Sequence, residues 1–166
     1  MIHVPAPDPF AVFALPRALE LDERALERKY LQLSRECHPD HNRAADTADC
    51  AAVLQRSAEI NDAWRVLRDR WARARALLEA ESPGVLERNK KLDPAFLVTA
   101  LELAEEVANS RAEQVPALRE RLRAALAADF DAVRDAIAAG DLDDAARRFH
   151  GAHYHRKALA DLEARQ

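Results

Sequence analysis

The chain has 166 residues, of which 33% are charged, 49% hydrophobic and 5% aromatic, with only 3 glycines. Length and composition fit one or two small folded domains that are mostly helical, and they exclude a disordered chain. The net charge is −4, with 12 Lys/Arg against 12 Asp/Glu in residues 1–78 and 13 against 17 in residues 79–166; neither half therefore carries the basic excess on which sequence-independent nucleic-acid binding depends.

Three helices are predicted in the first half of the chain. The first begins after Asp8, a capping residue followed by proline, and Pro16 ends it. The second begins after Asp22 and runs to about Cys37. Its core face has apolar residues at spacings of four, three and four, namely Leu26, Tyr30, Leu33 and Cys37. The third carries one mostly apolar seam, made of Val53, Ser57, Ile60, Trp64, Leu67 and Trp71.

Residues 79–92 contain the only Pro-Gly pair and a run of charge. This composition predicts a connector between two units, with the boundary near Pro83. Three more helices are predicted from their cap and stop residues, one from Asp93 to about Asn109, one from Pro116 to Gly140 and one after Asp141.

The triplet His38-Pro39-Asp40 lies just past the predicted end of the second helix. Proline disfavours a helical conformation in the residue before it and has a fixed φ itself, so the triplet is a stiff corner. Asp40 follows that corner, where its carboxylate can accept bonds from nearby backbone NH groups or face a cationic partner. The residues alone leave both roles open.

The triplet, the helix with Tyr30 before it, and the stretch Ile60 to Asp69 after it (INDAWRVLRD) together resemble the J-domain of DnaJ-type co-chaperones. The resemblance extends over the whole chain. Asp8-Pro-Phe near the start and "DPAFLVTALELAEEV" from Asp93 to Val107 are similar to the HscB family, the J-protein co-chaperones of iron-sulfur cluster assembly.

The resemblance implies an all-α fold in an L-shaped two-domain arrangement. Residues 1–78 would form a J-domain helical hairpin, residues 79–92 a connector, and residues 93–166 a C-terminal three-helix bundle. The J-domain would bind an HscA/DnaK-class ATPase chaperone and stimulate its ATP hydrolysis, and the bundle would bind an IscU-like iron-sulfur cluster scaffold protein. The chain itself would be no enzyme and would need no cofactor. A general J-domain co-chaperone that delivers a different client is the alternative.

Helical geometry places a basic stripe on the second helix, opposite its core face; the stripe consists of Arg24, Arg28, Leu31 and Arg35. Without other information such a row is most often a solvated surface. The resemblance instead implies that it meets an acidic surface of the chaperone. The residues implied to bind the chaperone are His38, Pro39, Asp40, Arg24, Arg28, Lys29 and Arg35.

The helix after Asp93 has two apolar stripes, about 100° apart. The first consists of Phe96, Ala100, Leu103 and Val107, and the second of Leu97, Leu101, Ala104 and Ala108. One stripe is enough for the bundle, so the second is either buried at an interdomain contact or exposed for a partner. The resemblance implies scaffold binding through Leu97, Leu101, Glu105 at the polar rim, and Tyr154 on the last helix.

Two chemical interpretations are disfavoured. Of His150, His153 and His155, only the first two can share a helix face, and no thiol or carboxylate completes a metal site at ligand spacing. A catalytic dyad of His38 and Asp40 lacks a third partner, and residues two apart around a proline are poorly placed for it. We therefore expect no metal site and no catalytic residue.

The expected location is the cytoplasm. Cys37 and Cys50 match no zinc spacing and do not suggest an oxidised scaffold. The first ten residues lack the cationic start and apolar run of a signal peptide, and no segment approaches the roughly 20 apolar residues of a membrane span.

Overall fold

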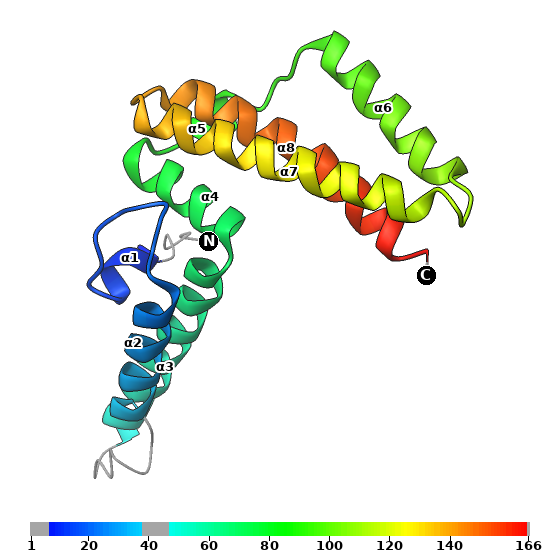
Figure 1. The fold of residues 1–166 in the computed structure, drawn as a ribbon. Coiled ribbons are helices and arrows are strands. Elements are labelled where there is room, and N and C mark those ends of the chain that lie inside the picture. Colours follow the sequence, from blue (N-terminus) through cyan, green and yellow to red (C-terminus); the bar gives the residue numbers. More distant parts are fainter. Residues whose placement is uncertain (1–6, 38–46, 166) are drawn as a thin grey trace. The chain divides into compact units, whose positions relative to one another are not determined.

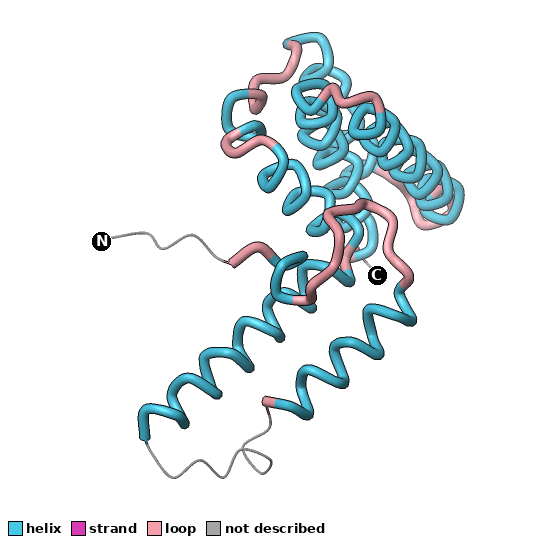
Figure 2. The backbone as a smooth tube through the Cα atoms, turned by 90° about the vertical axis from the view of Figure 1, so that its left-hand side faces the viewer, coloured by secondary structure: helices cyan, strands magenta, loops and turns pink. Residues whose placement is uncertain are grey.

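The computed structural model describes residues 7–37 and 47–165, and every regular element in these ranges is an α-helix (Figure 1, Figure 2). The all-α prediction is confirmed. The helices are α1 (Pro9–Val12), α2 (Glu23–Glu36), α3 (Thr47–Arg68), α4 (Arg70–Glu81), α5 (Val85–Arg88), α6 (Pro94–Asn109), α7 (Val115–Ala138) and α8 (Leu142–Glu163). The chain divides into two compact units, Met1–Ala80 and Glu81–Gln166, called here the first and the second unit.

In the first unit, α2 and α3 form a hairpin of two antiparallel helices (Figure 1). Asp22 caps α2 as predicted, because its Oδ1 accepts a hydrogen bond from the Ala25 amide at 3.0 Å. Across the hairpin, the Tyr30 and Trp64 rings are stacked with centroids 4.6 Å apart and planes at 12°. The Tyr30 hydroxyl also donates to Oδ1 of Asn61 at 2.9 Å. The stacked rings and this bond fix the register of α2 against α3.

Helix α1 is a single turn that buries two aromatic rings, those of Phe10 and the following Phe13. The Asp8 side chain caps it by accepting from the Phe10 amide at 2.9 Å, and it also pairs with Arg17 at 2.9 Å. Arg17 donates in turn to the Ala80 carbonyl at 3.1 Å. The predicted cap at Asp8 therefore also links the start of the chain to α4.

The helix after α3 differs from prediction. One helix was predicted to carry the whole seam through Trp71, and this is wrong because α3 ends at Arg68 and a new helix, α4, begins at Arg70. Asp69 causes the break. Its side chain accepts a hydrogen bond from the Ala72 amide at 2.7 Å, which is the bond of an N-cap.

Helix α4 contributes a buried cation to the first unit. Arg73 is only 4% exposed. Its Nε donates to the Leu19 carbonyl at 2.7 Å and one Nη donates to the Leu67 carbonyl at 2.5 Å. A single guanidinium thus joins the loop before α2, the end of α3 and the start of α4.

Replacing Arg73 with Met is expected to lower the free energy of unfolding of the first unit by about 2–3 kcal/mol, because two buried carbonyls lose their donors. Both tryptophans of the chain, Trp64 and Trp71, lie in this unit. Urea unfolding followed by tryptophan fluorescence therefore measures the first unit alone. Arg75→Met, an exposed position of the same helix, is the control and should change the midpoint little; equal midpoints for both variants would contradict the role of Arg73.

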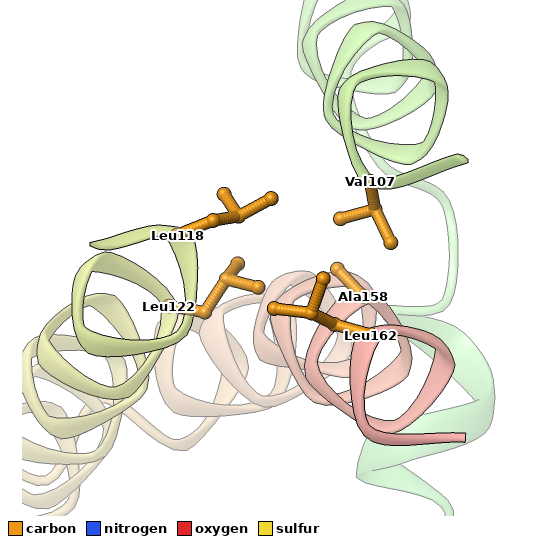
Figure 3. Close-up of a cluster of buried hydrophobic side chains, with 5 residues drawn as sticks. All are labelled: Val107, Leu118, Leu122, Ala158 and Leu162. Atoms are coloured by element: carbon orange, nitrogen blue, oxygen red, sulfur yellow. The ribbon is translucent and has the colours of Figure 1, made fainter. Parts of the chain in front are cut away.

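The second unit is built around α8, which packs against both α6 and α7. Figure 3 shows one part of its core, where side chains from all three helices converge. This cluster consists of Val107, Leu118, Leu122, Ala158 and Leu162. The predicted three-helix arrangement of this region is present.

Caps predicted from the sequence set the ends of these helices. The Asp93 side chain accepts from the Ala95 amide at 2.7 Å, and the Asp141 side chain accepts from the Asp144 amide at 2.8 Å. Gly140 follows the end of α7 with a φ of 77°, a left-handed conformation that glycine adopts without strain. These local signals are the reason why α6, α7 and α8 begin and end close to their predicted limits.

Residues 79–92, predicted as a connector, contain more structure than a linker. The division between the units falls after Ala80, at the end of α4. Val85 and Leu86 of α5 are buried, and α5 packs against α8. Next to α5, Asn89 and Arg88 donate to Oδ1 of Asp143 at 2.6 Å and 3.2 Å.

The hydrogen bond from Asn89, helped by Arg88, lowers the pKa of Asp143 below its ordinary value of 3.8. A carboxyl group with a lowered pKa stabilises the fold above its unfolded pKa, and this contribution is lost as the pH falls through the folded pKa. Asp143→Asn should therefore lower the Tm by at most about 3 °C at pH 7. The difference in Tm between variant and wild type should disappear as the pH falls below 3.8. Thermal unfolding followed by circular dichroism measures both Tm values. A Tm difference that grows towards acid pH would contradict this assignment.

Candidate interaction surfaces

The first candidate surface is the outer face of α2. Arg24, Arg28 and Arg35 are exposed, and they lie opposite the buried Leu26. Within the part of the chain that the structure describes, none of these three arginines makes a hydrogen bond or an ion pair with a side chain. Arg24 and Arg28 lie one helical turn apart, so their like charges repel each other. This row, together with Leu31 between Arg28 and Arg35, is called the basic ridge below.

The structure separates Lys29 from the basic ridge. Lys29 is half-buried, whereas the three arginines are exposed. At 100° per residue it lies about 140° from Arg24, next to the core face. The triplet His38, Pro39 and Asp40 lies outside the described residues. By sequence it follows directly on Cys37, the C-cap of α2, so it continues from the end of the helix that carries the ridge.

The second candidate surface is the outer face of α6. The two predicted stripes behave differently, because Ala100 and Val107 of the first stripe are buried while Leu97 and Leu101 of the second are 40% and 61% exposed. The side chains of Ala104 and Ala108 are exposed too. The second apolar stripe is therefore open, and exposed apolar surface of this kind is typical of a binding site.

Sequence reasoning missed one residue of this surface. Val98 is 58% exposed and lies one helical turn before Leu101. Its position three residues from Leu101 was a usable signal, since residues three apart are neighbours on a helix. Glu105 is exposed one turn after Leu101, as its predicted place at a polar rim requires.

Tyr154 of α8 contacts α6 through an aromatic pair. It is half-buried, and its ring meets the Phe96 ring edge-on, with centroids 5.6 Å apart and planes at 78°. Phe96 also covers Gly151, one turn earlier on α8. The predicted site residue Tyr154 thus lies beside α6, where it contacts Phe96 of the first stripe.

The three histidines of α8 have separate surroundings. Nε2 of His150 lies 2.8 Å from the Leu86 carbonyl, and Nδ1 of His155 lies 2.7 Å from a carboxylate oxygen of Asp129. His153 is exposed. Among the described residues, no three His, Cys, Asp or Glu side chains come close enough to hold a metal ion.

Comparison with known proteins identifies the family. The family model described as HSCB C-terminal oligomerisation domain matches residues 92–163. The co-chaperone protein HscB homolog of Bordetella avium is 35% identical over 147 residues, which make up 81% of this chain and 86% of that protein. The chain belongs to the HscB family of co-chaperones. HscB co-chaperones are regulators and not enzymes.

Solved structures of HscB proteins have the same fold. The chaperone HscB from Vibrio cholerae superimposes with a TM-score of 0.80 at 25% identity, over 95% of this chain and 96% of that one. Human co-chaperone HscB gives a TM-score of 0.84 at 22% identity, over 98% of this chain and 83% of that one. Within the ranges 7–37 and 47–165, this HscB-family chain has no helix with the length and apolar character needed to cross a bilayer.

Proposed function

We propose that this chain is a co-chaperone that binds an HscA/DnaK-class ATPase chaperone, stimulates its ATP hydrolysis and delivers to it an IscU-like iron-sulfur cluster scaffold protein. The observation that carries the proposal is the presence of two different unpartnered surfaces, one in each unit. The basic ridge of α2 is cationic, and the outer face of α6 is apolar. Two surfaces of different chemistry fit two different partners.

The basic ridge supports the chaperone half of the proposal. Exposed, unpaired arginines attract an acidic surface and raise the rate of encounter, an effect that salt weakens. The triplet with Asp40 follows the same helix in the sequence, so both elements can meet one partner. We assign the encounter to Arg24, Arg28 and Arg35 and the stimulation itself to His38-Pro39-Asp40.

The face of α6 supports the scaffold half. Its centre consists of Leu97, Val98 and Leu101, with Glu105 as an exposed charge at its edge. Apolar centres with polar rims are the usual anatomy of protein interfaces. Tyr154 of α8 would add to this apolar area, because aromatic side chains contribute much contact area at low entropic cost.

Delivery would take place in the cytoplasm, as the sequence predicts.

The proposal is tested by two calorimetric titrations of the full chain, one with the purified scaffold protein and one with the ATP-bound chaperone. We expect both to bind. Binding to the chaperone without binding to the scaffold would leave a general J-domain co-chaperone with a different client. Binding to neither would overturn the proposal.

A further inference from the structure

The basic ridge contains one large apolar residue. Leu31 is 46% exposed and lies one helical turn from Arg28 on one side and from Arg35 on the other. The three side chains, together with Gln32 and Glu36, line an open hollow of about 350 Å³. Gln32 donates to the Glu36 carboxylate at 2.8 Å, at the edge of this hollow. A leucine thus contributes apolar surface between two arginines, with Glu36 at the edge of the same hollow.

Exposure alone does not distinguish Leu31, because single exposed leucines are common on folded proteins. Its surroundings do. Leu54 of α3 is more exposed, at 64%, but the cation nearest to it in sequence, Arg56, is paired with Glu59 at 3.3 Å. Leu31 is flanked by arginines that have no partner among the described residues. The long apolar stems of such arginines add to the apolar surface that a neighbouring leucine offers.

We infer that Leu31 is an apolar contact residue for the chaperone, and that the chaperone presents an apolar side chain framed by carboxylates at this place. The inference rests on the proposed function and adds to it the chemistry of the partner surface. The unpaired arginines select carboxylates, and the hollow at Leu31 accepts the apolar side chain between them. Sites for small molecules enclose most of the ligand's surface, whereas this hollow is open. It therefore suits a side chain that protrudes from a protein surface.

This arrangement divides two tasks between neighbouring residues. The arginines act over a distance and chiefly affect how often the partners meet. Leu31 acts only on contact, by removing apolar surface from water, and it therefore affects how long they stay together. The two contributions differ in their response to salt, since screening weakens exposed charges and leaves apolar contacts intact.

Leu31→Gln is the variant that tests the inference. Leucine and glutamine have similar helix propensities, and the side chain is half exposed, so α2 should keep its stability. The measurement is the concentration of the chain that gives half-maximal stimulation of the chaperone's ATPase, in about 0.05 M and about 0.3 M KCl. Leu54→Gln is the matched control, because it makes the same change at a more exposed leucine of the same unit.

We expect Leu31→Gln to raise the half-maximal concentration about fivefold to tenfold at both salt concentrations. Leu54→Gln should match the wild type, and Arg28→Gln should weaken stimulation at low salt more than at high salt. A Leu31→Gln variant that equals the control would overturn the inference while the proposed function stands. An effect of Leu31→Gln that disappears at high salt would also overturn it. Absence of stimulation by the wild type would overturn the proposed function and this inference with it.

Discussion

Asp40→Asn is expected to reduce stimulation of the chaperone's ATPase to the chaperone's basal rate. The substitution keeps the size of the side chain and its ability to accept a hydrogen bond, but removes the negative charge. Asp40 directly follows Pro39 in the sequence, and a carboxylate at this place can pair with a cationic group of the chaperone. The loss should be complete because this carboxylate carries the stimulation in our proposal, whereas the arginines of the ridge carry the encounter.

The measurement is the steady-state rate of ATP hydrolysis by the chaperone at a saturating concentration of the chain. This condition distinguishes weaker binding from lost stimulation. Asp62→Asn is the matched control. Asp62 is an exposed carboxylate of α3 paired with Arg65 at 3.1 Å, so this variant loses the same charge elsewhere in the unit. It should stimulate like the wild type. Circular dichroism should show both variants folded, and full stimulation by a folded Asp40→Asn variant would contradict the role of the triplet.

The double variant Leu97→Ala/Leu101→Ala should lose most of its affinity for the scaffold protein. Truncating apolar residues at the centre of an interface commonly costs about 1–1.5 kcal/mol each, so the expected loss is about 2–3 kcal/mol, or roughly thirty- to 150-fold in Kd. Both side chains are at least 40% exposed and belong to the open stripe of α6, so the second unit should keep its stability.

Two controls make this prediction specific. Leu54→Ala makes the same chemical change at an exposed leucine of the first unit and should bind scaffold normally. Asp40→Asn should also bind scaffold normally, since its effect belongs to the chaperone surface. Calorimetric titration with the scaffold protein measures the Kd of every variant. If the double variant binds the scaffold with wild-type affinity, α6 is not part of the scaffold interface.

Helix ends could be predicted from the sequence because their causes are local. Asp22, Asp93 and Asp141 each bond to a backbone amide two or three residues ahead, so a few neighbouring residues decide each helix start. Helical spacing also separated Leu97 and Leu101 from the core face of α6, but it left open whether their stripe is buried or exposed. Spacing likewise places Lys29 about 140° from Arg24, outside the basic ridge.

Features that depend on distant residues could not be predicted in this way. Arg73 is charged and would be expected at the surface from the sequence alone. Only the carbonyls of Leu19 and Leu67 make its burial favourable. The contact of Tyr154 with Phe96 joins positions on different helices, and no local pattern reports it. The burial of Val85 and Leu86 similarly follows from their contact with α8 rather than from the Pro-Gly stretch around them.

The central claim is that one chain couples a chaperone to a cluster scaffold through two separate surfaces. The most direct test is the rate of ATP hydrolysis by the HscA/DnaK-class chaperone with the chain and the scaffold protein added singly and together. The account predicts that the two added together stimulate hydrolysis by more than the sum of their separate effects. It also predicts that Asp40→Asn and Leu97→Ala/Leu101→Ala each abolish this excess. A rate with both proteins that equals the sum of the separate effects, or no stimulation at all, would contradict it.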